Sequence, residues 1–145
     1  FGYTDSDWAG DTVERKSTSG YAFFIGSSMF FWNSKKQQVI ALSIAKAEYI
    51  AATNSATQTF WLRCILGVLK HKQVDPMKIY CDSKSAIELS KNPVLHGHSK
   101  HIDIKYHFIS ELVRERKIEV DYYIPEEQVA DIFTKALKAE TFVIL

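Results

Sequence analysis

The sequence predicts an α/β domain with a mixed five-stranded sheet and helices on both faces. Three β-rich runs separated by short turns open the chain, and they should form an antiparallel meander. A long alanine-rich segment with helical spacing follows, after which strands alternate with helices. The expected order is β-β-β-α-β-α-α-β-α, which is typical of a sheet covered on both sides.

The N-terminal half should supply three strands and the longest helix. Its expected elements are strands at 1–8, 21–25 and 29–34 and a helix at 43–69. Gly10 marks a turn, and the polar stretch 11–18 suits a hairpin loop.

Prolines divide the C-terminal half. The expected elements are a strand at 78–81, a helix at 83–90, an irregular histidine-rich loop at 94–100, a helix at 102–116, a strand at 118–124 and a last helix at 129–137. Pro76, Pro93 and Pro125 fall between these elements, where proline interrupts regular structure.

Composition bounds the possible functions. Hydrophobic residues make up 46% of the 145 residues, so we expect residues 1–145 to form a single domain. The net charge is only +1, so any basic surface that binds nucleic acid must be local. Cys64 and Cys81 are too few for a disulfide framework, which indicates a reducing environment. Without a signal segment or a bilayer-spanning apolar run, we expect neither secretion nor a membrane partner.

Acidic residues fall at informative places in this order. Asp5 lies on the first strand, and Asp82 ends the fourth, which can lie parallel beside the first. Glu48 lies one turn into the long helix, and Asp131 opens the last helix. Four carboxylates gathered at one edge would repel each other, and Mg²⁺, which prefers oxygen ligands, would relieve that repulsion. Two such ions can stabilise both the attacking and the leaving oxygen in phosphodiester cleavage.

Each acid also has an ordinary explanation. Asp131 suits a helix N-terminus and Asp82 suits an N-cap. Asp7 and Asp11 are as plausible as Asp5 when judged alone. Spacing therefore leaves the metal cluster as one of several interpretations.

Eight sequence blocks in one order span nearly the whole chain. They are Thr4–Asp11, Arg15–Tyr21, Trp32–Gln37, Ala47–Ala51, Tyr80–Ile87, Lys91–Pro93, Lys100–Ile109 and Gln128–Lys135. These blocks resemble the ribonuclease H domain of copia-type LTR retrotransposon polyproteins, and so many blocks are far more specific than one short motif. The resemblance implies a ribonuclease H-like fold.

The resemblance also implies an endonuclease that hydrolyses the RNA strand of RNA–DNA hybrids during reverse transcription and leaves 5′-phosphate ends. Asp5 should bridge two Mg²⁺ ions, for which Mn²⁺ should substitute, and Asp131 should share the ion that activates water. Glu48 and Asp82 should hold the ion on the leaving-group side, with Glu48 sensing the RNA 2′-hydroxyl. The implied partners are the hybrid and the adjacent reverse transcriptase domain, in a cytoplasmic virus-like particle or the nucleus.

One departure from the family pattern keeps an alternative open. The family usually reads Ser-Thr-Glu-Ala-Glu-Tyr where this chain has Ile44-Ala-Lys-Ala-Glu-Tyr49. Lys46 replaces the first glutamate, which supports Glu48 as the ligand but places a cation near the site. The alternative is a catalytically silent module that binds the hybrid or the polymerase domain. An integrase-like core is disfavoured by the fourth acid and the Thr-Asp-Ser-Asp-Trp opening.

Basic and polar residues suggest where nucleic acid binds. Lys35, Lys36 and Gln37, between a strand and the long helix, should track backbone phosphates, although a solvated loop is equally compatible. Further contacts are expected from the basic stretch that runs from the fourth strand into the later helix, at Ser83, Lys84, Lys100 and Lys105. The His96-Gly-His98 sequence lacks a cysteine pair and is too weak to indicate zinc.

Overall fold

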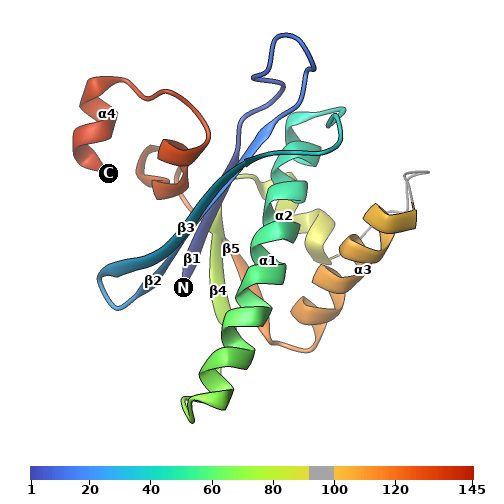
Figure 1. Ribbon diagram of the computed structural model, residues 1–145, viewed down its shortest axis with the longest axis vertical. Helices are drawn as coiled ribbons and strands as arrows, with labels where there is room; N and C mark the ends of the chain where they lie inside the picture. Colours follow the sequence, from blue (N-terminus) through green and yellow to red (C-terminus); the bar gives the residue numbers. More distant parts are fainter. Residues whose placement is uncertain (92–99) are drawn as a thin grey trace.

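The computed structural model shows a five-stranded mixed sheet with helices on both faces (Figure 1). It describes residues 1–91 and 100–145, apart from the side chains of residues 100–103, 105 and 144. The strands are β1 (Gly2–Ser6), β2 (Thr18–Ile25), β3 (Ser28–Lys36), β4 (Met77–Cys81) and β5 (Ile118–Tyr122). Their order in the sheet is β3-β2-β1-β4-β5, with β1 antiparallel to β2 and parallel to β4. The predicted meander and crossover are confirmed.

Three helices cover one face of the sheet. They are α1 (Ile44–Val68), α2 (Lys84–Lys91) and α3 (Lys100–Arg114). The main core lies between these helices and strands β4 and β5, and Tyr49, Ile79, Ile109 and Ile118 are its large, fully buried side chains. In α1, alanines at 47, 51, 52 and 56 are buried, and small side chains let the helix approach the sheet closely. No helix in the described part of the chain is long and apolar enough to cross a membrane.

The opposite face carries the last segment of the chain. Here the short 3-10 helix η2 (Val129–Phe133) and helix α4 (Ala139–Ile144) follow a first 3-10 turn, η1 (Pro125–Glu127) (Figure 1). Phe133 stacks on Trp32 of β3, with ring centroids 5.0 Å apart. Gly20 of β2 lies directly beneath η2.

The prediction of one helix over residues 129–137 is wrong. The segment is instead η2, which ends at Phe133, and α4 begins only at Ala139. The buried Gln128 side chain accepts a hydrogen bond from the Ala130 N–H (3.3 Å) and donates one to the Thr4 carbonyl (3.2 Å). The Thr134 N–H then bonds the Asp131 carbonyl (3.1 Å), which closes a tighter turn than an α-helix has. Tertiary contacts therefore override the local helical spacing.

We predict that replacing Gly20 with alanine disturbs this packing. A Cβ atom at Gly20 would lie 2.7 Å from Thr134 Cγ2 and 2.9 Å from Phe133 Cβ. Gly20→Ala should lower the free energy of unfolding by about 1–3 kcal/mol, the usual cost of overpacking. Gly67→Ala is the matched control: nothing lies within 4 Å of its Cβ position, so it should be neutral or stabilising by about 0.5 kcal/mol. Urea unfolding measures both, and equal losses would contradict the close packing of η2.

Candidate functional site

The four predicted acids converge from four separate elements. Asp5 comes from β1, Glu48 from α1, Asp82 from the turn after β4, and Asp131 from η2. Carboxylate oxygens of Asp5, Asp82 and Asp131 lie within 4.8 Å of one another, and Glu48 and Asp82 are equally close with Cys81. Asp82 belongs to both groups, so the structure gathers all four carboxylates into one cluster.

Asp5 lies at the centre of the cluster and is almost completely buried. Its register partner on β2 is Gly20, which leaves room for η2 above the carboxylate. The Thr134 hydroxyl donates a hydrogen bond to Asp5 Oδ2, and the Lys135 ammonium lies 3.8 Å from the same oxygen. These contacts fix the orientation of the carboxylate without a metal.

Glu48 reaches the cluster from α1, on the other side of the sheet. Ser43 caps α1 by accepting a hydrogen bond from the Lys46 N–H (3.1 Å), and this sets where Glu48 falls on the helix. Glu48 Oε1 then accepts a hydrogen bond from the Ser6 N–H at the end of β1 (3.1 Å). Glu48 Oε2 and Asp131 Oδ1 are buried and accept no hydrogen bond from the described residues.

The cluster is electrostatically strained. Burial and the charge of Asp131 raise the pKa of Asp5 from 3.8 to about 7. Burial and the charges of Asp5 and Asp82 raise the pKa of Glu48 still further. Burial and Asp131 also raise the pKa of Asp82. Asp5, Glu48 and Asp82 are therefore hard to ionise in the absence of a cation.

This donor set fits a hard divalent cation. The buried oxygens of Glu48 and Asp131 that accept no hydrogen bond are suitable ligands, and Mg²⁺ and Mn²⁺ favour carboxylate oxygen. Cys81 adjoins Glu48 and Asp82, but burial raises the pKa of its thiol, so it stays protonated and is a poor ligand.

Asp7 and Asp11, which spacing alone could not separate from Asp5, have structural roles. Asp7 accepts a hydrogen bond from the Thr18 N–H and so fixes the hairpin between β1 and β2. Asp11 stabilises the loop by accepting hydrogen bonds from the N–H groups of Val13 (2.9 Å) and Glu14 (3.1 Å). Neither carboxylate is part of the acid cluster.

Lys46, the departure from the family pattern, has its ammonium next to aromatic rings. It lies 5.3 Å from the ring centroid of Tyr106 and 6.0 Å from that of Tyr49. The principal charges acting on Glu48 are those of Asp5 and Asp82. The cap of α1 and the acid cluster are thus both formed with Lys46 in the chain.

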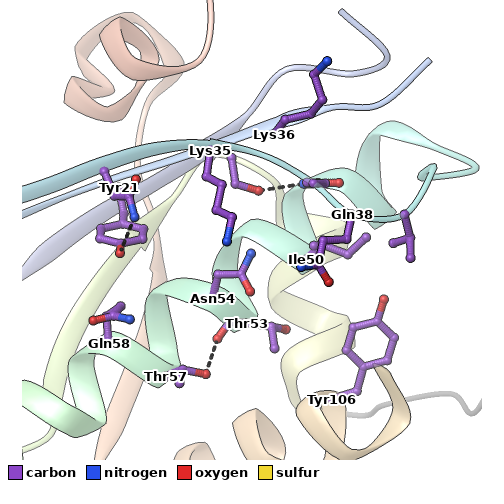
Figure 2. Close-up of a pocket in the computed structure, with 14 residues that line it drawn as sticks. Tyr21, Lys35, Lys36, Gln38, Ile50, Thr53, Asn54, Thr57, Gln58 and Tyr106 are labelled. Atoms are coloured by element: carbon purple, nitrogen blue, oxygen red, sulfur yellow. Dashed lines mark hydrogen bonds between the residues drawn. The ribbon is translucent and has the colours of Figure 1, made fainter. Parts of the chain in front are cut away.

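The predicted phosphate-binding residues Lys35 and Lys36 differ in their surroundings. The strand extends to Lys36, so Lys35 and Lys36 point to opposite sides of it (Figure 2). Lys36 pairs with Asp11, whereas Lys35 points toward Asn54 of α1. Gln37 is buried, and its amide bonds Ser19 Oγ (2.8 Å) and the Ala47 carbonyl (3.0 Å). The Gln37 side chain therefore ties β2 to α1, and its contact with nucleic acid stays a prediction.

Lys35 borders a polar groove between β3 and α1 (Figure 2). The cavity measures about 270 Å³, and its walls carry the amides of Asn54 and Gln58 and the hydroxyl of Thr57. None of the residues described as lining it is acidic. An anionic group would therefore meet the Lys35 ammonium, with Lys36 also in the lining, and several hydrogen-bond donors there.

The other predicted nucleic-acid contacts, at Ser83, Lys84, Lys100 and Lys105, stay predictions. The Ser83 hydroxyl caps α2 by accepting a hydrogen bond from the Ala86 N–H (3.2 Å). Lys84 is exposed, with its ammonium 5.0 Å from the ring centroid of Tyr122. Lys100 and Lys105 lie on α3, but their side chains are outside the described residues, as is the stretch 92–99.

Thr134 and Lys135 are site residues that sequence reasoning missed. Lys135 follows Asp131 by four positions, and its ammonium lies 3.1 Å from Asp131 Oδ2. The signal was available, since both residues fall in the last family block. Their contact with Asp5, 129 and 130 positions away in sequence, required the fold.

We predict that the metal-free protein loses stability as pH rises from about 4 to about 7. The raised pKa of Asp5 means that the folded state keeps a proton that the unfolded chain releases near pH 3.8. Ionisation therefore costs folding free energy across this interval, roughly 1–4 kcal/mol. Melting temperatures in EDTA should show the fall, and Asp5→Asn should reduce it. In Asp11→Asn, which removes a carboxyl with a lowered pKa, the fall should persist. A constant or rising melting temperature of the unmodified chain would contradict this account.

No family model matches the chain. It is 43% identical over 97% of its length to the retrovirus-related Pol polyprotein from transposon TNT 1-94 of Nicotiana tabacum. It is 38% identical over 97% of its length to the corresponding polyprotein from transposon RE2 of Arabidopsis thaliana. The chain spans about a tenth of the length of these curated relatives.

Two solved structures show the same fold. LC11-RNase H1 in complex with RNA/DNA hybrid superposes with a TM-score of 0.62 at 14% identity, covering 92% of this chain and 91% of that one. A prototype foamy virus protease–reverse transcriptase superposes with a TM-score of 0.57 at 14% identity, covering 94% of this chain and 21% of that one. The chain is thus homologous to a segment of the retrovirus-related Pol polyproteins of plant transposons, and it has the ribonuclease H fold.

Proposed function

We propose that this chain hydrolyses the RNA strand of RNA–DNA hybrids, with two Mg²⁺ ions held by Asp5, Glu48, Asp82 and Asp131. The observation that carries the proposal is the convergence of four carboxylates, three of them with raised pKa values, at one edge of the sheet. Such a cluster is costly to a fold unless a cation neutralises it. The hybrid in the LC11-RNase H1 structure supports the choice of substrate.

The chain's own residues position the acids before any substrate arrives. Thr134 orients Asp5, the Ser6 N–H orients Glu48, and the turn of η2 orients Asp131. Bound Mg²⁺ would supply activation of water and stabilisation of charge on the phosphate. Asp82 is only half-buried, so it lies toward the open side of the cluster, where the scissile phosphate would approach. Preorganised ligands spare the reaction the cost of reordering them.

We further propose that the activity serves reverse transcription in a copia-type element, next to a polymerase domain of the same polyprotein. The length of the homologous Pol polyproteins supports a multidomain context. The foamy virus protein, which joins a protease and a reverse transcriptase, supports the same arrangement. A silent module remains the alternative, but its main motivation weakens because the four acids gather with Lys46 in the chain.

We predict that Asp5→Asn and Asp82→Asn each reduce hybrid cleavage at least about a hundredfold, because each removes several kcal/mol of transition-state stabilisation. The assay uses end-labelled RNA–DNA hybrid, double-stranded RNA and double-stranded DNA, each with Mg²⁺, Mn²⁺ or EDTA. Cleavage should be confined to the RNA of the hybrid and should stop in EDTA. Asp7→Asn is an unsuitable control because Asp7 holds a hairpin, so Asp121→Asn on β5 serves instead.

Full activity of Asp5→Asn would refute the site. Tight hybrid binding by the unmodified chain without any cleavage would favour the silent module. Cleavage of double-stranded DNA would point to a different nuclease class.

We predict that Lys35→Ala weakens hybrid binding, whereas Lys36→Ala does so less. Lys35 faces an acid-free groove, while Lys36 is already paired with Asp11. Loss of one phosphate contact should lower the slope of log affinity against log salt concentration by about 1. Fluorescence anisotropy in EDTA, where the RNA is not cut, measures both quantities. An unchanged slope for Lys35→Ala would exclude the groove from the binding surface.

A further inference from the structure

One cation of the chain already lies within the acid cluster. The Lys135 ammonium lies 3.1 Å from Asp131 Oδ2 and 3.8 Å from Asp5 Oδ2. Both carboxylates are almost fully buried, whereas the Lys135 side chain is 44% exposed. The ammonium thus bridges two of the acids and still borders solvent.

The backbone around Lys135 is fixed, so only its side chain is free to move. The N–H groups of Thr134 and Lys135 both donate to the Asp131 carbonyl at 3.1 Å. The Thr134 hydroxyl anchors the same turn to Asp5. The side chain can therefore swing toward solvent without disturbing η2.

Charge makes Lys135 and a metal ion competitors. One ammonium leaves most of the charge of four ionised carboxylates uncompensated, whereas two divalent cations match that charge without Lys135. A divalent cation bound to Asp5 and Asp131 would lie within a few ångströms of the ammonium, where like charges repel strongly. The ammonium and a divalent cation therefore compete for the charge of these two carboxylates, even where the cation binds the unpartnered Oδ1 of Asp131.

We propose that Lys135 is a built-in counter-ion that a divalent cation must displace from Asp5 and Asp131, so that this lysine sets the metal affinity of the site. The proposal rests on the proposed function, because it takes the acids as metal ligands. The displaced ammonium stays tethered at the exposed rim of the cluster, where a phosphate of the nucleic acid would approach. An ordinary surface ion pair would instead contribute almost nothing.

The test is a Mg²⁺ titration of the full chain, in which the NMR shifts of the backbone amides at the four acids report binding. Lys135→Gln should reach its midpoint at about fivefold lower Mg²⁺ concentration, the scale expected from removing one partly exposed ion pair. Lys135→Arg keeps the charge and should bind Mg²⁺ no more tightly than the unmodified chain. Lys78→Gln is the matched control, since Lys78 is 49% exposed and pairs with Asp121 at 3.3 Å. It should leave the midpoint unchanged.

A second measurement separates the counter-ion role from a merely structural one. In EDTA at pH 8, Lys135→Gln should melt below the unmodified chain, and Mg²⁺ should raise its melting temperature by more. Equal midpoints for Lys135→Gln and the unmodified chain, or tighter binding by Lys135→Arg, would overturn the counter-ion role alone. If the unmodified chain showed no Mg²⁺-dependent shifts at the acids, the metal site itself would fall, and the counter-ion role with it.

Discussion

Repulsion among four carboxylates is the constraint that organises this molecule. Asp5, Glu48 and Asp131 are buried, and burying charged carboxylates costs free energy because they lose contact with water. The fold tolerates the cost because each acid comes from a different element whose position is fixed elsewhere. β1 and β4 are held by parallel pairing, α1 by its Ser43 cap and alanine-rich face, and η2 by Gln128 and Gly20.

The polar groups nearest the acids offset part of this repulsion. The Ser6 N–H and the Thr134 hydroxyl stabilise the charged carboxylates, and charge-assisted hydrogen bonds of this kind are strong. Even so, burial and mutual repulsion outweigh them, since the pKa values of Asp5 and Glu48 remain raised. The imbalance distinguishes this cluster from ordinary surface acids such as Asp11, whose pKa is lowered to about 2 by Lys36 and backbone N–H groups.

Much of the fold was predictable because periodicity and turn chemistry agree with it. The three N-terminal strands, the long helix and the crossover to β4 all follow from local spacing. The site was harder to predict, because carboxylates separated by tens of residues meet only through the sheet. Spacing could not separate Asp5 from Asp7 and Asp11, and family resemblance was needed to choose. The failures share one cause. The last helix was misjudged, and the burial of Gln37 was not foreseen, because side-chain hydrogen bonds across the molecule decide both conformations.

The irregular form of η2 has a physical use in such a site. An α-helix from residue 129 onward would also place Asp131 and Lys135 on one face. It would, however, lose the turn that places the Thr134 hydroxyl against Asp5. The tighter 3-10 turn places the carboxylate, the hydroxyl and the ammonium of three nearby residues around a single buried aspartate. Gly20 admits this turn at close range, since a Cβ atom there would lie 2.7 Å from Thr134 Cγ2. Under the proposed counter-ion role, this last segment of the chain would set cation affinity through the Lys135 side chain and not through the sheet.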